Sequence, residues 1–277
     1  MKIFEFHGGL GNQIFEYIYL QYLKMKFPND VFYSYFFDKQ HWIHNGFELD
    51  KWFEVEIPPT STKTDLLAYL CYQGSRILRH LPFNLPFHLS SDDYNINEKK
   101  LFHQGWYQDK KFFLEVGAPS FKSDIVIDIN NSKILQAIMK QNSVAIHIRR
   151  GDYLLPKNSK ALGGICTKKY YDNAISKIKE IIEDPHFFFF SDDIQFVEDN
   201  FDDLDKTVVN WNTGEKSFFD MYLMAHASNM ILANSTFSCC AAYLNKNARY
   251  VLCPPLWNKI FNPDLNLSDW IVVDNKD

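Results

Sequence analysis

The sequence predicts an α/β protein that folds into two lobes. Its 277 residues are too many for one small core and suit two packed lobes of ordinary size. With 46% hydrophobic and 17% aromatic residues, the chain has enough apolar material to fold throughout. From about residue 133 onward, apolar strand-like segments alternate with helix-like segments, which is typical of a parallel sheet covered by helices on both faces.

The N-terminal segment predicts one strand–helix unit. We expect a strand over residues 2–6, a glycine-rich turn over 8–13, and an apolar helix over 14–27 that Pro28 ends. The aromatic run at 31–37 predicts a second strand.

The stretch from 38 to 125 is expected to be irregular, because prolines break its pattern repeatedly. Within it lies an aromatic cluster at 104–113 that includes Trp106 and Tyr107. We interpret this cluster as core rather than as a sugar-facing surface.

The remaining elements follow from alternating apolar runs. Strands are expected at 143–149, 186–191, 207–211, 230–233 and 249–253. Helices are expected at 132–140, 168–182, 194–201, 217–227 and 235–244. Ligands of open parallel sheets lie beyond the carboxyl ends of the strands, so residues directly after each strand are the candidates for function.

Charge and cysteine usage narrow the class of protein. The net charge of -5 comes without a basic stripe, which argues against a nucleic-acid partner. Five cysteines, an odd number without Cys-x-x-Cys spacing, favour a reducing compartment. We find neither a signal peptide nor an apolar run of about 18 residues, so we expect a cytoplasmic, bacterial protein without a membrane span. Peripheral contact with the inner membrane stays open.

The strand expected at 143–149 ends in a cluster of polar side chains. Strand alternation places His147 and Arg149 on the same face. Arg149 is suited to bind a phosphate, because its planar guanidinium donates paired hydrogen bonds and keeps its charge. The alternative is a structural ion pair with Asp152, which we favour for Arg150 and not for Arg149.

Two further strand ends carry polar groups. Ser191, Asp192 and Asp193 follow one buried strand, and we expect one carboxylate to cap the next helix and the other to bind a nucleoside. Asn234, Ser235 and Thr236 follow another strand and open a helix. Alone they predict ordinary N-capping, but on the same sheet edge as Arg149 they predict a diphosphate site at a helix N-terminus.

Two other patterns are weaker. The turn at 8–13 contains glycines that allow a ligand close to the backbone, but it lacks the third glycine of a dinucleotide fingerprint. Asp203 and Asp205 have the spacing of a metal-binding Asp-x-Asp pair, yet lie in a polar stretch that we interpret as solvated surface. We therefore expect neither a nicotinamide cofactor nor a metal.

Four motifs together resemble glycosyltransferase family 11, the α-1,2-fucosyltransferases: they lie at 8–13, 147–153, 189–193 and 234–238, in the family's order. The resemblance implies a GT-B fold of two Rossmann-like lobes with a donor cleft between them, an acceptor lobe at 1–132 and a donor lobe at 133–277. It implies inverting transfer of fucose from GDP-β-L-fucose to the 2-hydroxyl of a terminal galactose, on an oligosaccharide or glycolipid of a lipopolysaccharide or capsule. The donor-binding residues it implies are Gly9, Gly11, Asn12, Gln13, Arg149, Ser191, Asp192, Asp193, Asn234, Ser235, Thr236 and Phe237.

The expected mechanism needs no metal. Arg149 and the helix start at 234–236 would stabilise the leaving diphosphate, and His147 or Asp152 would serve as the general base. Two alternatives remain: another nucleotide-sugar transferase of the same fold, which a panel of donors would identify, and a non-catalytic glycan-binding protein, which would not bind GDP.

Overall fold

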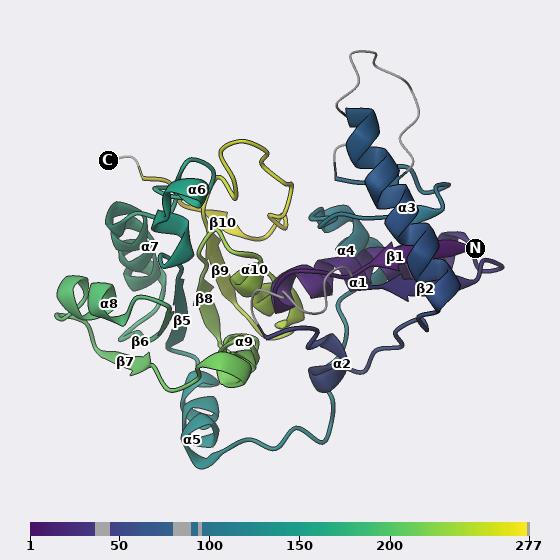
Figure 1. Ribbon diagram of the computed structural model, residues 1–277. Helices are drawn as coiled ribbons and strands as arrows, with labels where there is room; N and C mark the ends of the chain where they lie inside the picture. The colour runs from purple at the N-terminus through teal and green to yellow at the C-terminus, as the bar shows by residue number, and fades with distance from the viewer. Residues whose placement is uncertain (37–44, 80–89, 94–95, 276–277) are drawn as a thin grey trace. The chain divides into compact units, whose positions relative to one another are not determined.

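The computed structural model describes residues 1–36, 45–79, 90–93 and 96–275, and the chain divides into two compact units (Figure 1). Unit 1 comprises Met1–Ser123 and unit 2 comprises Asp124–Asp277. The boundary that we expected at 132/133 falls inside helix α5 (Ile129–Ile138), the whole of which belongs to unit 2. Both units are α/β and contain parallel sheets, as the sequence predicted.

Unit 1 is built on a four-stranded sheet of order β2-β1-β4-β3 in which all paired strands are parallel. Its strands are β1 (Lys2–Glu5), β2 (Phe32–Tyr35), β3 (Ser90–Ser91) and β4 (Phe102–His103). Its helices are α1 (Leu10–Lys26), α2 (Leu49–Trp52), α3 (Thr62–Arg79) and α4 (Lys110–Val116).

Helix α1 begins four residues earlier than expected. Gly9 is its N-cap residue, in an extended conformation, so the glycine-rich segment supplies the first turn of the helix rather than a separate turn. Asn12 and Gln13 therefore project from a helix, which changes what their side chains can contact.

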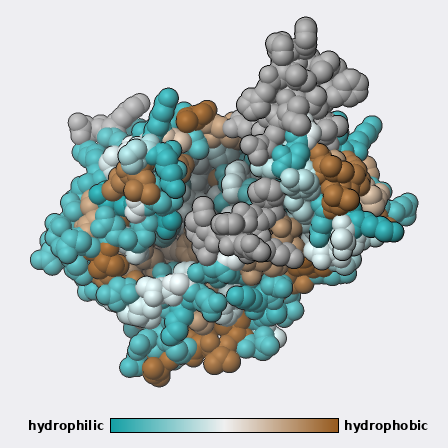
Figure 2. Space-filling view, in the orientation of Figure 1, coloured by the Kyte–Doolittle hydropathy of each residue, from teal (hydrophilic) through white to brown (hydrophobic). Residues whose placement is uncertain are grey.

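The stretch from 38 to 125 is more regular than expected, as far as it lies within the described residues; 38–44, 80–89 and 94–95 lie outside them. It contains α3, which Pro58 and Pro59 precede rather than interrupt. Ala68 of α3 is buried against Ile3 and Phe102 of the sheet. Leu66 and Leu70 remain exposed, and Figure 2 shows a hydrophobic patch over this helix.

Unit 2 is built on a six-stranded, wholly parallel sheet of order β10-β9-β8-β5-β6-β7. Its strands are β5 (Ser143–Ile148), β6 (His186–Ser191), β7 (Lys206–Val209), β8 (Asn229–Ile231), β9 (Tyr250–Cys253) and β10 (Ile271–Val272). Five of the six were expected; β10 has only two residues, too few to show a period.

Helices and short 3₁₀ turns connect these strands. Besides α5 they are η1 (Asp152–Leu154), α6 (Pro156–Ser159), α7 (Lys168–Ile181), α8 (Ile194–Asn200), η2 (Gly214–Ser217), α9 (Phe218–Met224) and α10 (Thr236–Leu244). The expected helices are confirmed, with ends that differ by at most three residues.

The core of unit 2 explains why β5 is oriented as it is. Val144, Ile146 and Ile148 belong to one apolar cluster with Tyr170 and Tyr171 of α7. Burying each large apolar side chain contributes about 1.5–3 kcal/mol, so this face is fixed and His147 must project to the other. Neither unit has, among its described residues, a helix long and apolar enough to cross a bilayer.

Candidate functional site

Three polar strand ends meet at one edge of the unit 2 sheet. β5 lies between β6 and β8, and Ile148 pairs in register with Ser191, so the segments that follow these strands are neighbours. Two hydrogen bonds join them: the main-chain N–H of Arg150 donates to Asp192 at 2.8 Å, and the hydroxyl of Tyr153 donates to the carbonyl of Asn234 at 3.2 Å. The expected grouping of these motifs is thus seen within unit 2.

Arg149 is held by two carboxylates. Nη2 lies 2.7 Å from Oδ1 of Asp152, and Nη1 lies 3.0 Å from Oδ2 of Asp192, while 29% of the side chain stays exposed. The guanidinium is therefore oriented by the protein and still accessible to an anion.

Arg150 has a different partner from the one we favoured. Its Nε lies 2.9 Å from Oδ2 of Asp193, not near Asp152, and its guanidinium stacks over Phe196 at 3.8 Å. The ion pair with Asp152 belongs to Arg149. Our preference for an Arg150–Asp152 pair was wrong, because Arg150 projects to the side where α8 begins.

The two aspartates after β6 have separate roles. Asp193 caps α8 by accepting from the N–H of Phe196 at 3.1 Å, and its hydrogen bond from Arg150 lowers the pKa of the carboxyl. Asp192 contacts both residues after β5: Oδ1 accepts the main-chain N–H of Arg150, and Oδ2 pairs with the guanidinium of Arg149. A Cβ on Gly151 would lie 2.8 Å from Oδ2 of Asp192, so this close approach requires glycine.

In the segment that opens α10, the side chains of Asn234 and Ser235 form hydrogen bonds within the protein. Ser235 is the N-cap and accepts from the N–H of Phe237 at 3.3 Å. Nδ2 of Asn234 donates to the carbonyls of Leu162 and Trp257, and the residue is 4% exposed. The amide donors of Asn234 thus hold the surrounding loops together, and its expected contact with the donor stays a prediction. Thr236 and Phe237, in the first helical turn, are half-buried.

His147 is a weak proton acceptor in this setting. The residue is 7% exposed, and its Nδ1 has no hydrogen-bond partner among the described residues. Burial, reinforced by the charge of Arg149, lowers the pKa of His147 to about 4. The ring lies 5.7 Å from that of Phe237.

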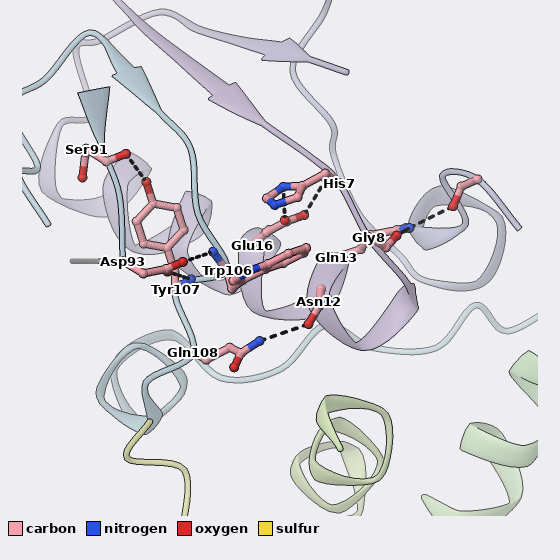
Figure 3. A network of polar contacts seen from close by, with 11 residues as sticks. His7, Gly8, Asn12, Gln13, Glu16, Ser91, Asp93, Trp106, Tyr107 and Gln108 are labelled. Carbon is pink, nitrogen blue, oxygen red and sulfur yellow. Dashed lines mark hydrogen bonds and ion pairs between the residues drawn. The ribbon is translucent and has the colours of Figure 1, made fainter. Parts of the chain in front are cut away.

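In the glycine-rich segment of unit 1, the side chain of Gln13 is bonded within the protein. Gln13 is fully buried, donates to the carbonyls of Gly8 and Gly46, and accepts from the N–H groups of Glu48 and Leu49. These four hydrogen bonds join the start of α1 to the segment that leads into α2, and the expected contact of Gln13 with the donor stays a prediction. Gly9 and Gly11 form the start of α1, and Oδ1 of Asn12 accepts from Gln108 at 3.1 Å (Figure 3).

Sequence reasoning missed a polar pair that lies directly after β1. Nδ1 of His7 lies 2.8 Å from Oε1 of the buried Glu16, and the ring stacks on Trp106 with 3.9 Å between centroids (Figure 3). Asp93 holds this arrangement by accepting from the N–H groups of Trp106 and Tyr107 at 2.9 and 2.6 Å. The available signal was a glutamate in the middle of an otherwise apolar helical run.

The two aromatic side chains at 106–107 differ in burial, and only Tyr107 lies fully in the core. Tyr107 is core, 1% exposed, with its hydroxyl bonded to the carbonyl of Ser91 at 3.0 Å. Trp106 is half-buried beside His7.

In the Asp-x-Asp pair at 203–205, one carboxylate forms an ion pair within unit 2. Asp205 pairs with Nδ1 of His186 at 2.8 Å. No group of three or more His, Cys, Asp or Glu side chains in the described ranges is arranged to hold a metal ion.

Two α/β units with parallel sheets, one of them carrying a partly exposed arginine at its carboxyl edge, have the architecture of the GT-B type. Residues 88–274 match the sequence model of Glycosyl transferase family 11, and the chain belongs to this family. The chain is 28% identical to an alpha-1,2-colitosyltransferase of Escherichia coli, over 90% of each chain. It is 27% identical to the O-antigen biosynthesis glycosyltransferase WbnK of the same species, over 95% of this chain and 97% of the relative.

Solved structures agree on the fold. Fucosyltransferase NodZ from Bradyrhizobium matches 90% of this chain and 92% of its own, with a TM-score of 0.51 and 11% identity. A NodZ crystal soaked with GDP-fucose gives a TM-score of 0.50 at 12% identity.

Proposed function

We propose that this glycosyltransferase transfers L-fucose from GDP-β-L-fucose to the 2-hydroxyl of a terminal galactose, with inversion and without a metal. The observation that carries the proposal is the accessible guanidinium of Arg149, oriented by Asp152 and Asp192 beside the start of α10. Family membership and the soaking of NodZ with GDP-fucose support the donor. The α-1,2 linkage in the name of one E. coli relative supports the 2-hydroxyl.

In this proposal, unit 2 binds the donor. Negative charge grows on the diphosphate as the sugar leaves, and a preoriented cation stabilises that charge without reorganising. Arg149 supplies the cation, and the first turn of α10, with Thr236 and Phe237, supplies the positive end of a helix dipole. Ser191 and Asp192 are the candidates for contacts to the nucleoside, while Gly9, Gly11 and Asn12 remain candidates for contacts in unit 1.

A second candidate donor is a related GDP-linked deoxyhexose. The first of the E. coli relatives is named a colitosyltransferase, and it aligns over most of both chains. Arg149 and the helix start would serve the same diphosphate, so the difference would lie in the sugar pocket. The O-antigen role of the other relative supports a cytoplasmic enzyme with an oligosaccharide or glycolipid acceptor, and peripheral membrane contact remains compatible with that acceptor.

The experiment that tests this function is isothermal titration of the protein with GDP, UDP and ADP in buffer that contains a metal chelator. We expect selective binding of GDP, followed by transfer from GDP-fucose to lactose in the same buffer. Arg149→Ala should abolish turnover while the fold is retained. Arg249→Ala is the matched control, since Arg249 is exposed just before β9, at the opposite edge of the same sheet. Binding of UDP in preference to GDP, or full activity in Arg149→Ala, would contradict the proposal.

A further inference from the structure

Unit 2 exposes apolar side chains on the two segments that follow strands β5 and β9. The first segment comprises residues 153–167 and includes α6, and the second comprises residues 254–263. Five large apolar side chains of these segments are between 41% and 68% exposed, and we call them the apolar patch: Leu154, Leu155, Leu256, Ile260 and Phe261.

The two segments lie side by side. The main-chain N–H of Lys259 donates to the carbonyl of Ala161 at 2.9 Å. Nδ2 of Asn234 joins them a second time, since it donates to the carbonyls of Leu162 and Trp257 at 3.1 and 3.3 Å. In Figure 1, α6 and the loop that precedes β10 lie at the same end of unit 2. The apolar patch is therefore one surface.

The second segment is held in a fixed conformation. Trp257 is 4% exposed, and its main-chain N–H donates to Oδ1 of Asn262 at 2.7 Å. Oδ1 of Asn258 accepts from the N–H groups of Ile260 and Phe261 at 2.8 and 3.2 Å, and side-chain bonds of this kind stabilise a turn. The fold thus buries one aromatic side chain of the segment and keeps Ile260 and Phe261 in solvent.

The charge of this surface is opposite to that of the whole chain. The chain has a net charge of -5, whereas the two segments contain three lysines and no acidic residue. All three lysines are exposed: Lys157, Lys160 and Lys259. The acidic residues that flank the segments in sequence are Asp152, which pairs with Arg149, and Asp264.

Apolar side chains interspersed with lysines fit the surface of an anionic bilayer. Their ammonium groups are attracted to lipid phosphates, while the apolar side chains enter the boundary between headgroups and acyl chains. Protein–protein interfaces are instead depleted in lysine and enriched in arginine, which neither segment contains. We propose that the apolar patch and its three lysines dock unit 2 on the surface of an anionic lipid bilayer.

The place of the patch in the chain links docking to the reaction. Leu154 follows Asp152 by two residues, and Asp152 pairs with Arg149 at 2.7 Å. A docked unit 2 would hold this arginine near the membrane surface. If the proposed function holds, a glycolipid acceptor lies in the same membrane, and confinement to one surface raises its effective concentration. Docking itself needs no donor, so it can be measured independently of turnover.

The test is co-sedimentation of the protein with vesicles of phosphatidylcholine, with and without phosphatidylglycerol, in the absence of substrates. We expect binding to the mixed vesicles to be at least about tenfold tighter than to neutral vesicles, and to weaken as salt is raised. Lys157→Glu combined with Lys160→Glu should lower the affinity for mixed vesicles by about tenfold or more, because attraction becomes repulsion. Ile260→Ser combined with Phe261→Ser should lower it by about tenfold through lost apolar burial.

The matched control lies on α5, outside the patch. Ile129 is 69% exposed, close to the 68% of Ile260, and Lys133 is exposed on the same helix. Ile129→Ser combined with Lys133→Glu makes the same chemical changes and should bind mixed vesicles as wild type does. Thermal unfolding and GDP titration are recorded for every variant.

Loss of vesicle binding in the patch variants, with GDP affinity unchanged, supports docking on lipid. Wild type that does not bind mixed vesicles, patch variants that bind them as wild type does, or an equal loss in the control overturns it. A dimer in lipid-free buffer that the two serine substitutions dissociate would assign the patch to a second copy and overturn it too. If the serine variant fails to fold, the glutamate variant decides. Wild-type protein that binds vesicles but no GDP contradicts the proposed function alone.

Discussion

Nη1 of Arg149 lies 3.0 Å from Oδ2 of Asp192, so the carboxylate that follows β6 holds the arginine that follows β5. The same carboxylate accepts the N–H of Arg150 through its other oxygen at 2.8 Å. The orientation of a guanidinium that we assign to the donor diphosphate thus depends on a residue from the neighbouring strand.

Asp192→Asn should weaken GDP binding by about tenfold, because it removes one charged partner while preserving the shape of the side chain. The measurement is GDP titration at constant ionic strength. Asp172→Asn serves as the control, since Asp172 pairs with Lys168 on the exposed side of α7 and should leave GDP affinity unchanged. Equal affinity in both variants would show that Asp192 does not position Arg149.

Sequence reasoning was most successful where the signal was local. The strands of unit 2 are apolar runs such as 187–190, and burial on both faces demands that pattern. Strand alternation correctly placed His147 opposite the face that packs on α7. The two-residue strands β3 and β4 carry no period that a sequence pattern could reveal.

Sequence patterns could not show which partners a side chain finds in the folded chain. Gln13 is bound by Gly46 and Glu48, and Asn234 by Leu162 and Trp257, all of them distant in sequence. The pair of His7 with Glu16 was missed although only nine residues separate them, because it forms across a strand-to-helix turn. A motif shows which residues stand together, but the tertiary partners decide which of their polar atoms remain available.

Gln13→Ala should reduce the free energy of unfolding by about 2–4 kcal/mol, because it leaves several buried main-chain groups without partners. Urea unfolding followed by circular dichroism measures this loss. GDP titration of the folded variant also tests the expected donor contact of Gln13, since an affinity equal to that of wild type would contradict it. Gln195→Ala, on the exposed face of α8, should change stability by no more than about 0.5 kcal/mol.

Gly8→Ala should be more destabilising than its backbone conformation alone explains. Gly8 has φ +75°, and a Cβ there would lie 2.6 Å from the ring of Trp106. Gly117 has a similar φ of +79° with no atom within 4 Å of the same position, so Gly117→Ala measures the conformational cost alone, about 1–2 kcal/mol. A larger loss for Gly8→Ala in urea unfolding, with altered tryptophan fluorescence, would show that Trp106 had moved. Equal losses would mean that the ring shifts at no cost.

Asp220 in the first turn of α9 should make stability fall as pH rises. Burial raises the pKa of its carboxyl from 3.8 to about 7, against the stabilising hydrogen bond from Nδ2 of Asn212 at 2.8 Å. Between about pH 4 and 7 the folded state keeps the proton on Asp220, whereas the unfolded chain has released it. The free energy of unfolding therefore falls as the pH rises through this range and stays at its lower value above it. Asp220→Asn keeps an oxygen that accepts from Asn212 and cannot ionise. Its stability relative to wild type should therefore increase by ~1–3 kcal/mol between pH 5 and pH 8, measured by urea unfolding. Asp199→Asn, at an exposed position of α8, provides the control, and a pH-independent difference for Asp220→Asn would refute the shift.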